Sequence, residues 1–209
     1  ITQISSELSK MPEKNDIGRQ AVLRVQVAEK KKTAKDICSI KLVSLGDQLP
    51  TFQPGAHIDL HLQNGLIRQY SLVNGPGETN FYNIGVKLDP LSTGGSEYLH
   101  KDIREGDVLA CSVPRNNFPL RRDSLKTIFV AGGIGLTPLL SMTQSLDVMN
   151  LNYEFHYFVQ NEDHIAFSSI LKKLKKTPLV YLGLSPKLTK KKLNEILLGP
   201  KNSMNLYVC

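Results

Sequence analysis

The chain has few cysteines and no long hydrophobic segment. Its three cysteines, Cys38, Cys111 and Cys209, are odd in number and far apart, which excludes a disulfide framework and a cysteine metal site. The longest mostly apolar stretch, residues 127–142, is short for a membrane span and rich in glycine. The first residues are polar and mixed, unlike a secretory signal. We therefore expect a cytoplasmic protein without a membrane segment.

Patterns of metal ligands and catalytic triads are also missing. The five histidines show no ligand spacing, and no ordered serine, histidine and aspartate set stands out, so we expect no metal site. The net charge is +7, with lysines in runs such as residues 30–32 and 190–192. No aromatic residues are interleaved with these runs. We expect solvated faces of strands and helices, and no nucleic-acid surface.

Length and composition indicate two globular domains. A chain of 209 residues, 41% hydrophobic and 22% charged, has room for two domains of about 100 residues each. The chain begins without Met and stops inside a strand-like segment, residues 206–209. We therefore expect a piece of a longer protein.

The first half alternates short strand patterns with turn signals and predicts a small antiparallel β-barrel at residues 17–120. One short helix is expected at residues 96–104, with Ser96 as its cap. The expected strands are residues 21–27, 38–43, 56–62, 66–73, 81–88 and 108–113.

The second half alternates strands and helices and predicts an α/β domain with a parallel sheet at residues 125–209. Thr137 and Ser185 are expected helix caps, and Pro138 suits a first helical position. The expected strands are residues 127–131, 153–159, 179–184 and 205–209, and the expected helices are residues 137–148, 165–176 and 187–198.

A glycine turn follows the first strand of this second domain. Gly132, Gly133 and Gly135 allow backbone N–H groups to approach a phosphate at the start of a helix. Pro138 stands where the dinucleotide fingerprint has its third glycine, and the next strand ends in Gln160 without the acidic residue of that fingerprint. A tight turn without a ligand remains the alternative.

Two stretches of the first domain could hold a flavin. Arg68 could pair with a phosphate, Tyr70 could cover a ring, and Ser71 could bond a ring nitrogen. Residues 93–96 before the short helix, with Lys87 upstream, could hold a phosphomonoester. The alternatives are an ordinary edge strand and a flexible hairpin loop.

In order and spacing these motifs resemble the phthalate dioxygenase reductase family, which includes vanillate demethylase reductases, in the ferredoxin–NADP reductase superfamily. The resemblance covers about residues 20–209. It rests on residues 54–59, 68–72, 86–87 with 94–96, 114–120 and 132–138.

The resemblance implies a flavin-binding barrel followed by a nicotinamide-nucleotide domain. It implies FMN as the flavin, because residues 94–96 match a loop that grips a terminal phosphate. Ser71 and Cys209 are the implied catalytic positions. The implied FMN contacts are Arg68, Tyr70, Ser71, Lys87, Gly94, Gly95, Ser96 and Thr137. The implied NAD contacts are Gly132, Gly133, Gly135 and Pro138.

The implied activity is hydride transfer from NAD(P)H to FMN, then electron transfer to an iron–sulfur acceptor of a Rieske-type oxygenase. Gln160 and Asn161 replace the Arg-Ser pair common in the family, which favours NADH over NADPH. Relatives carry a C-terminal ferredoxin domain with a 2Fe–2S cluster that this chain lacks. Expected partners are a ferredoxin domain or ferredoxin-like acceptor and an oxygenase component. The alternatives are a stand-alone flavin reductase and a flavin-binding module without turnover.

Overall fold

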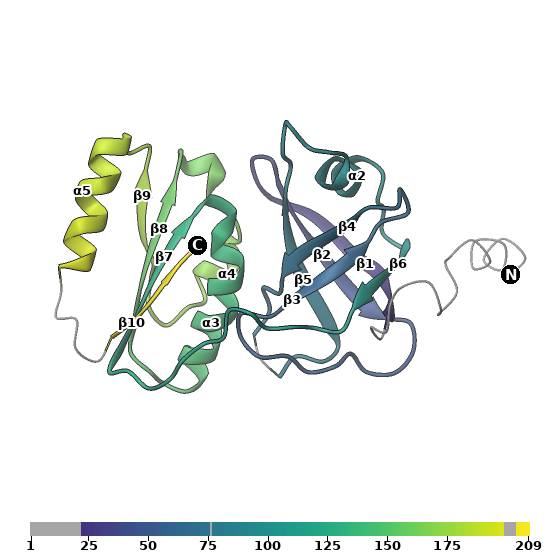
Figure 1. Cartoon of the computed structure of the whole chain (residues 1–209), viewed down its shortest axis with the longest axis horizontal. Helices are drawn as coiled ribbons and strands as arrows, with labels where there is room; N and C mark the ends of the chain where they lie inside the picture. Colours follow the sequence, from purple (N-terminus) through teal and green to yellow (C-terminus); the bar gives the residue numbers. More distant parts are fainter. Residues whose placement is uncertain (1–21, 76, 199–203) are drawn as a thin grey trace, which may run out of the picture.

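The computed structural model describes residues 22–75, 77–198 and 204–209. In this part of the chain an antiparallel sheet is followed by a parallel sheet, and the two lie beside each other (Figure 1). This arrangement confirms the predicted fold class. The predicted domain start at residue 17 and strand start at residue 21 lie outside the described residues.

The first domain is a closed antiparallel barrel. The sheet order is β4-β3-β6-β1-β2-β5, and a bridge between Leu72 and Ile84 joins the β4 edge to β5. The strands are β1 (Val22–Ala34), β2 (Ile37–Ser44), β3 (His57–His61), β4 (Ile67–Ser71), β5 (Phe81–Lys87) and β6 (Val108–Ser112). One helix, α2 (Gly95–Lys101), follows β5.

Alternating side chains fill the barrel. Ile58 and Leu60 of β3 are fully buried, whereas Asp59 between them is partly exposed. This period of two is what a strand with one face on a core requires. Leu99 anchors α2 in the same core.

β1 is longer than the predicted strand because its lysine run also pairs with β2, from Lys30 opposite Ile40 to Lys32 opposite Cys38. The Lys30 ammonium is half-buried and donates to the carbonyl oxygens of His100 and Ile103, each at 2.8 Å. These carbonyls lie at the end of α2, where cations are favourable. Lys30 therefore stabilises the end of α2, whereas the lysine run was predicted to lie on a solvated face.

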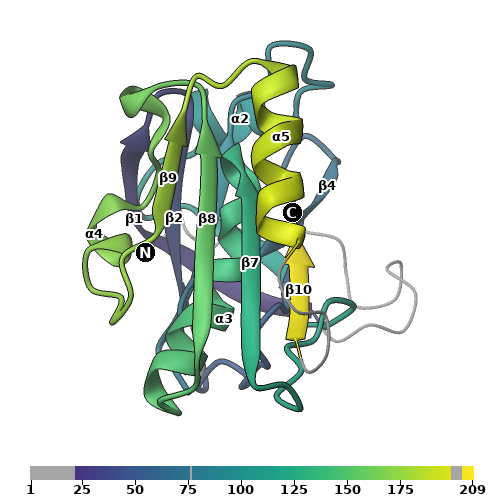
Figure 2. The ribbon, with the colours of Figure 1, turned by 90° about the vertical axis from the view of Figure 1, so that its left-hand side faces the viewer.

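The second domain is a parallel sheet of order β10-β7-β8-β9. Its strands are β7 (Lys126–Gly132), β8 (Tyr153–Val159), β9 (Leu179–Leu182) and β10 (Met204–Val208). Its helices are α3 (Leu136–Val148), α4 (Ser168–Leu171) and α5 (Pro186–Leu197), with 3-10 turns η1 (Gly133–Gly135) and η2 (Glu162–His164). α3 and α4 lie on the side of the sheet toward the barrel, and α5 covers the opposite side (Figures 1 and 2).

Two predicted helix starts were wrong. α2 begins after Gly94, and Ser96 instead accepts a hydrogen bond from the Asp89 N–H. α3 continues directly from η1 at Leu136, whose N–H is already bonded within that turn, so Thr137 does not cap it. The Ser185 cap is confirmed by its hydrogen bond from the Leu188 N–H.

The predicted helix at residues 165–176 was also wrong, since α4 has four residues. Phe167, directly before it, has φ of 55°, in the left-handed region that a helix cannot contain. Its ring is buried in the second core. Burial of this aromatic side chain therefore outweighs the helical pattern.

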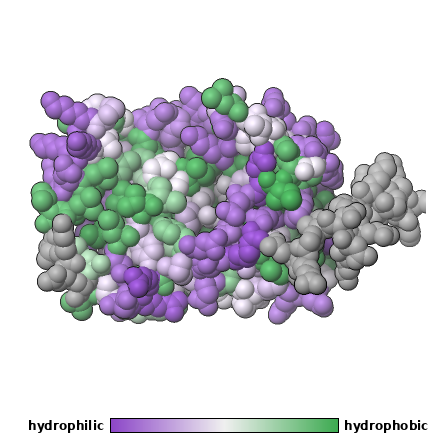
Figure 3. Space-filling model, in the orientation of Figure 1, coloured by the Kyte–Doolittle hydropathy of each residue, from purple (hydrophilic) through white to green (hydrophobic). Residues whose placement is uncertain are grey.

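Apolar side chains also reach the surface over α5 and β10 (Figure 3), among them Leu197, Leu206 and Val208. α5 buries no residue fully, whereas α3 buries ten. The barrel-facing side of the sheet therefore contributes most of the core of this domain.

The hairpin between β1 and β2 joins the two domains. Ala34 and Ile37 at its tip belong to the hydrophobic core of the second domain. The Lys35 N–H donates to the Asp163 carbonyl oxygen at 2.7 Å. In the opposite direction, the Gln144 side chain of α3 in the second domain donates to the Val73 carbonyl oxygen of the barrel. The barrel is thus fixed against the parallel-sheet domain by both polar and apolar contacts.

Gly85 of β5 lies at a close approach of the two domains. A Cβ there would lie 2.7 Å from the Thr137 methyl group and 2.9 Å from the Phe167 ring. Both distances are far below ordinary van der Waals contact. This seam therefore requires a residue without a side chain.

We expect Gly85→Ala to lower the free energy of unfolding by about 1–3 kcal/mol, because the added methyl forces packed groups apart. Denaturant unfolding measures the change. Gly46→Ala is the control, since no atom lies within 4 Å of a Cβ there, and it should stay within about 0.5 kcal/mol of the parent. Equal stability of Gly85→Ala and the parent would contradict the close packing of the seam.

Candidate functional site

A cleft of about 770 Å³ lies between the domains, at the carboxyl ends of β7, β8 and β9. The arrowheads in Figure 2 mark this edge of the sheet. The barrel side of the cleft is formed by Asp36, Ile37, Lys87, Leu88 and Pro90. The sheet side includes Gly132, Gly133, Ile134, Phe158, Gln160, Tyr181, Gly183 and Thr189. Open parallel sheets bind ligands in the crevice at this edge.

The glycine turn borders the cleft and is held by the last strand. The Gly132 N–H donates to the Cys209 carbonyl oxygen at 2.7 Å, and the Cys209 N–H donates to the Val130 carbonyl oxygen. A Cβ on Gly135 would lie 2.4 Å from the Cys209 carbonyl carbon. The structure thus brings Cys209 beside two of the predicted NAD residues, Gly132 and Gly135. Burial raises the pKa of its thiol, which stays protonated near neutral pH.

Arg68 lies against the loop before α2. Its guanidinium donates to the Thr93 hydroxyl at 2.5 Å and to the Ile67 carbonyl oxygen at 2.9 Å. The rest of its side chain packs directly on Gly95. A cation is therefore placed beside a loop of small residues, Thr93 to Ser96, which is an arrangement suited to a phosphate.

Tyr70 lies on the same strand as Arg68 and packs on the barrel core. Burial raises the pKa of its hydroxyl to about 12, so this group remains neutral. Ser71 ends β4 opposite His57 and is partly exposed. The structure thus places the predicted ring-covering residue and hydroxyl at the carboxyl end of one strand.

Lys87 and Thr137 lie at the seam between the domains. Lys87 lines the cleft together with Gly132 and Gly133 of the opposite domain. Thr137 is buried, its methyl faces Gly85, and its hydroxyl donates to the Ile134 carbonyl oxygen at 3.1 Å. Pro138 is buried in the first turn of α3. Strand β5 and turn η1 are in contact, so the two predicted sites adjoin.

Sequence reasoning missed several residues of the cleft, including Asp36, Phe158, Tyr181 and Thr189. They come from a hairpin, two strands and a helix, and no local motif connects them. The rule that ligands bind at the carboxyl ends of parallel strands could have found Phe158 and Tyr181.

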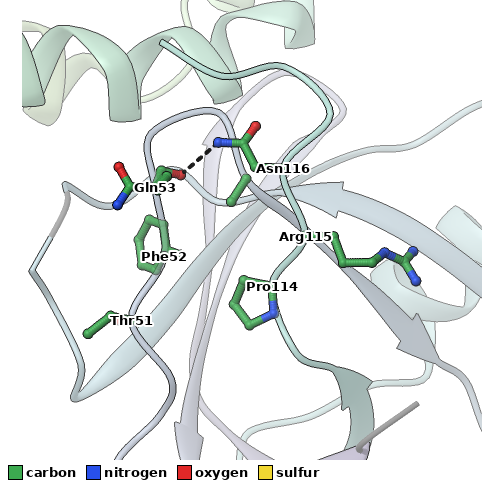
Figure 4. A pocket seen from close by; sticks show the side chains of 7 residues that line it. Thr51, Phe52, Gln53, Pro114, Arg115 and Asn116 are labelled. Carbon is green, nitrogen blue, oxygen red and sulfur yellow. Dashed lines mark hydrogen bonds between the residues drawn. The ribbon is translucent and has the colours of Figure 1, made fainter. Parts of the chain in front are cut away.

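A smaller cavity of about 190 Å³ lies on the barrel, between the segment before β3 and the segment after β6 (Figure 4). Asn116 donates to backbone oxygens there, and the Arg115 side chain points away from Phe52 and pairs with Asp59. This cavity contains none of the predicted site residues. The larger cleft is therefore the candidate functional site.

The described residues also show what kinds of segment and site they can form. No helix among them is long and apolar enough to cross a membrane. No group of three or more histidine, cysteine or acidic side chains among them could hold a metal ion.

Known proteins show the same architecture. The chain is 38% identical over 185 residues to the vanillate O-demethylase oxidoreductase of Pseudomonas putida, which covers 88% of this chain and 58% of that protein. It is 42% identical over 147 residues to the phthalate dioxygenase reductase of Burkholderia cepacia, which covers 69% of this chain and 46% of that protein. A solved structure of phthalate dioxygenase reductase superposes with a TM-score of 0.71 and 31% identity, over 90% of this chain and 68% of that chain.

The chain belongs to the phthalate dioxygenase reductase family. It therefore has the flavin- and NAD(P)H-binding fold of that family. The chain spans about half the length of the curated relatives described above. No family model matches the chain.

The contact between Gly135 and Cys209 gives a stability prediction for this family member. We expect Gly135→Ala to lower the free energy of unfolding by about 1–3 kcal/mol, because the backbone of Cys209, which is hydrogen-bonded to Val130 and Gly132, cannot move aside as a flexible side chain can. Gly132→Ala is the matched control in the same turn, since its Cβ would lie 3.7 Å from the nearest atom. Calorimetry of the two variants checks the difference, and equal melting temperatures would contradict the contact.

Proposed function

We propose that the chain is the flavin and nicotinamide module of an oxidoreductase that passes electrons from NAD(P)H to an iron–sulfur acceptor. The observation that carries this proposal is that Lys87 of the barrel and the glycine turn of the parallel sheet line one cleft, and that β5 contacts both the glycine turn and β4, the strand of Arg68, Tyr70 and Ser71. The related phthalate dioxygenase reductase is described as transferring electrons from pyridine nucleotides to a 2Fe–2S centre.

We propose FMN as the flavin. The Arg68 guanidinium and the Thr93 hydroxyl lie beside Gly95 and offer donors for a terminal phosphate. Tyr70 provides an aromatic face and Ser71 a hydroxyl further along the same strand. These donors fit a phosphomonoester, which is the group that ends FMN.

We propose NADH as the reductant. The uncharged Gln160 lines the cleft just after β8. A cation at this position would favour the 2′-phosphate of NADPH, and Gln160 provides none. Gly132, Gly133, Gly135 and Pro138 would shape the turn that receives the pyrophosphate.

A bound flavin supplies the redox chemistry, because it accepts hydride from a dihydronicotinamide and releases electrons one at a time. The protein contributes the geometry and the exclusion of water. Ser71 would direct its hydroxyl to the flavin ring. The neutral thiol of Cys209 and the backbone of Gly132 would border the nicotinamide, because they lie together at the edge of the cleft.

We propose that the receiving 2Fe–2S cluster lies in a ferredoxin domain or a ferredoxin-like protein outside this chain. Such clusters need four cysteine ligands, and this chain has three. An oxygenase component would then be the final partner.

A cytoplasmic location is proposed as well, since the three free thiols suit a reducing compartment.

We also propose that the flavin domain comprises residues 17–120 and the nucleotide domain residues 125–209.

Two alternative functions differ from this proposal in whether and how the chain turns over. A stand-alone flavin reductase would oxidise NADH with free ferredoxin or oxygen, and a binding module would hold FMN without being reduced.

The proposed function predicts that the purified chain is yellow and loses its flavin absorbance on anaerobic mixing with NADH. Stopped-flow absorbance measures the reduction in a single turnover. Bound FMN that NADH does not reduce would favour the binding module. A colourless chain that ignores added FMN would contradict the proposal.

Arg68 provides a second prediction. Arg68→Ala should weaken FMN binding by about ten- to a hundredfold, because a hydrogen bond to a charged group contributes about 1.5–3 kcal/mol. Fluorescence titration of FMN measures the dissociation constant. Arg24→Ala, on an exposed position of β1, is the control and should bind FMN like the parent. An unchanged affinity in Arg68→Ala would remove this residue from the site.

A further inference from the structure

The α5 side of the parallel sheet carries a set of aromatic and ionisable side chains that reaches the cleft. Phe158 of β8 lies directly opposite Tyr181 of β9 in the parallel ladder, and His156 is two positions earlier on the same face as Phe158. The Lys192 ammonium of α5 lies over the Tyr181 ring, so these side chains are on the α5 side of the sheet, which is turned away from the barrel (Figure 1). Phe158 and Tyr181 also line the cleft, so they border its end farthest from the flavin domain.

The two rings form a stacked pair. Their centroids are 4.6 Å apart with an interplanar angle of 23°. The Tyr181 ring is also nearly parallel to the His156 imidazole, at 13° and 5.9 Å, and the imidazole meets the hydroxyl end of the ring. The Tyr181 ring is therefore supported by His156 and Phe158, and part of it remains available to the cleft.

A chain of polar contacts fixes the tyrosine hydroxyl. His156 is buried, its Nδ1 lies 3.0 Å from the Tyr181 hydroxyl, and its Nε2 lies 3.1 Å from Oε1 of Glu154. The contact between Nε2 and the carboxylate does not have hydrogen-bond geometry, but the negative charge 3.1 Å away favours the imidazole proton on Nε2. Nδ1 then accepts from the Tyr181 hydroxyl, which determines the orientation of that group.

The surrounding charges maintain these protonation states. Lys126 of β7 pairs with the Glu154 carboxylate and lowers its pKa, so Glu154 is ionised. Burial lowers the pKa of His156, and the ammonium groups of Lys126 and Lys192 lower it further, against the opposing effect of Glu154. The Lys192 ammonium also lies 5.8 Å from the centre of the Tyr181 ring.

We propose that Glu154 and His156 are positioning residues that hold Tyr181 against Phe158 as a rigid aromatic wall for the adenine ring of the dinucleotide. The inference rests on the proposed function, because it assumes that the cleft binds an adenine dinucleotide. Aromatic walls bind planar bases by stacking, and a wall held in advance loses less conformational freedom on binding. The nicotinamide half would lie next to the glycine turn, away from the Tyr181 ring.

The test separates the two halves of the dinucleotide. In the flavin-loaded chain, affinity for 5′-AMP reports on the proposed wall, and flavin reduction by reduced nicotinamide mononucleotide reports on the other half. His156→Leu removes the acceptor for Tyr181 and should weaken AMP binding about three- to tenfold. Reduction by the mononucleotide should keep the parental rate. His156→Asn retains an acceptor near the position of Nδ1 and should recover most of the AMP affinity.

Tyr181→Phe keeps the ring and removes the hydroxyl, so it should weaken AMP binding about as much as His156→Leu. If the two residues act through one hydrogen bond, the double variant should resemble either single variant, whereas independent effects would add. Unchanged AMP affinity, or an equal loss with AMP and with the mononucleotide, would overturn the inference. A parent chain that NADH cannot reduce would contradict the proposed function, whatever the variants show.

Discussion

The close contact between β5 and the start of α3 determines the shape of the candidate site. Gly85 has no side chain, so the Thr137 methyl and the Phe167 ring reach the strand backbone. The hairpin tip at Ala34 and Ile37 extends the same seam into the second core. Packed interfaces of this kind resist sliding, because moving one side forces many atoms out of contact. The cleft between the domains is therefore bounded by two surfaces, one from each domain, whose relative position is fixed.

The two sides of the cleft contribute different chemistry. The barrel side carries the Lys87 ammonium. Elsewhere on the barrel, β4 carries the Arg68 guanidinium, which is bonded to Thr93, and Tyr70, whose hydroxyl is kept neutral by burial. The sheet side offers backbone groups of the glycine turn near one end and the Tyr181 ring near the other. Cations and hydroxyls suit a flavin phosphate and ring, whereas a glycine turn and an aromatic wall suit a dinucleotide. This division supports a flavin and a nicotinamide nucleotide as the ligands of one protein.

Much of this architecture could be predicted from local sequence patterns. Alternation identified the barrel strands, and the glycine turn identified the βα unit. The prediction failed where distant contacts decide the local conformation. Phe167 interrupts a helical pattern because its ring is needed in the core, and Lys30 leaves solvent because the end of α2 lies beside it. The link from Glu154 through His156 to Tyr181 joins two strands, so no spacing along the chain reveals it.

The packing of Gly135 on the backbone of Cys209 has a consequence for how this domain is made in the cell. Val130 and Gly132 each form a hydrogen bond with Cys209, and Gly135 packs on the Cys209 backbone. All three residues emerge from the ribosome long before Cys209. Closing so long a loop is entropically unfavourable and slow. The glycine turn should thus reach its final structure only after Cys209 has been synthesised, with the preceding barrel already folded.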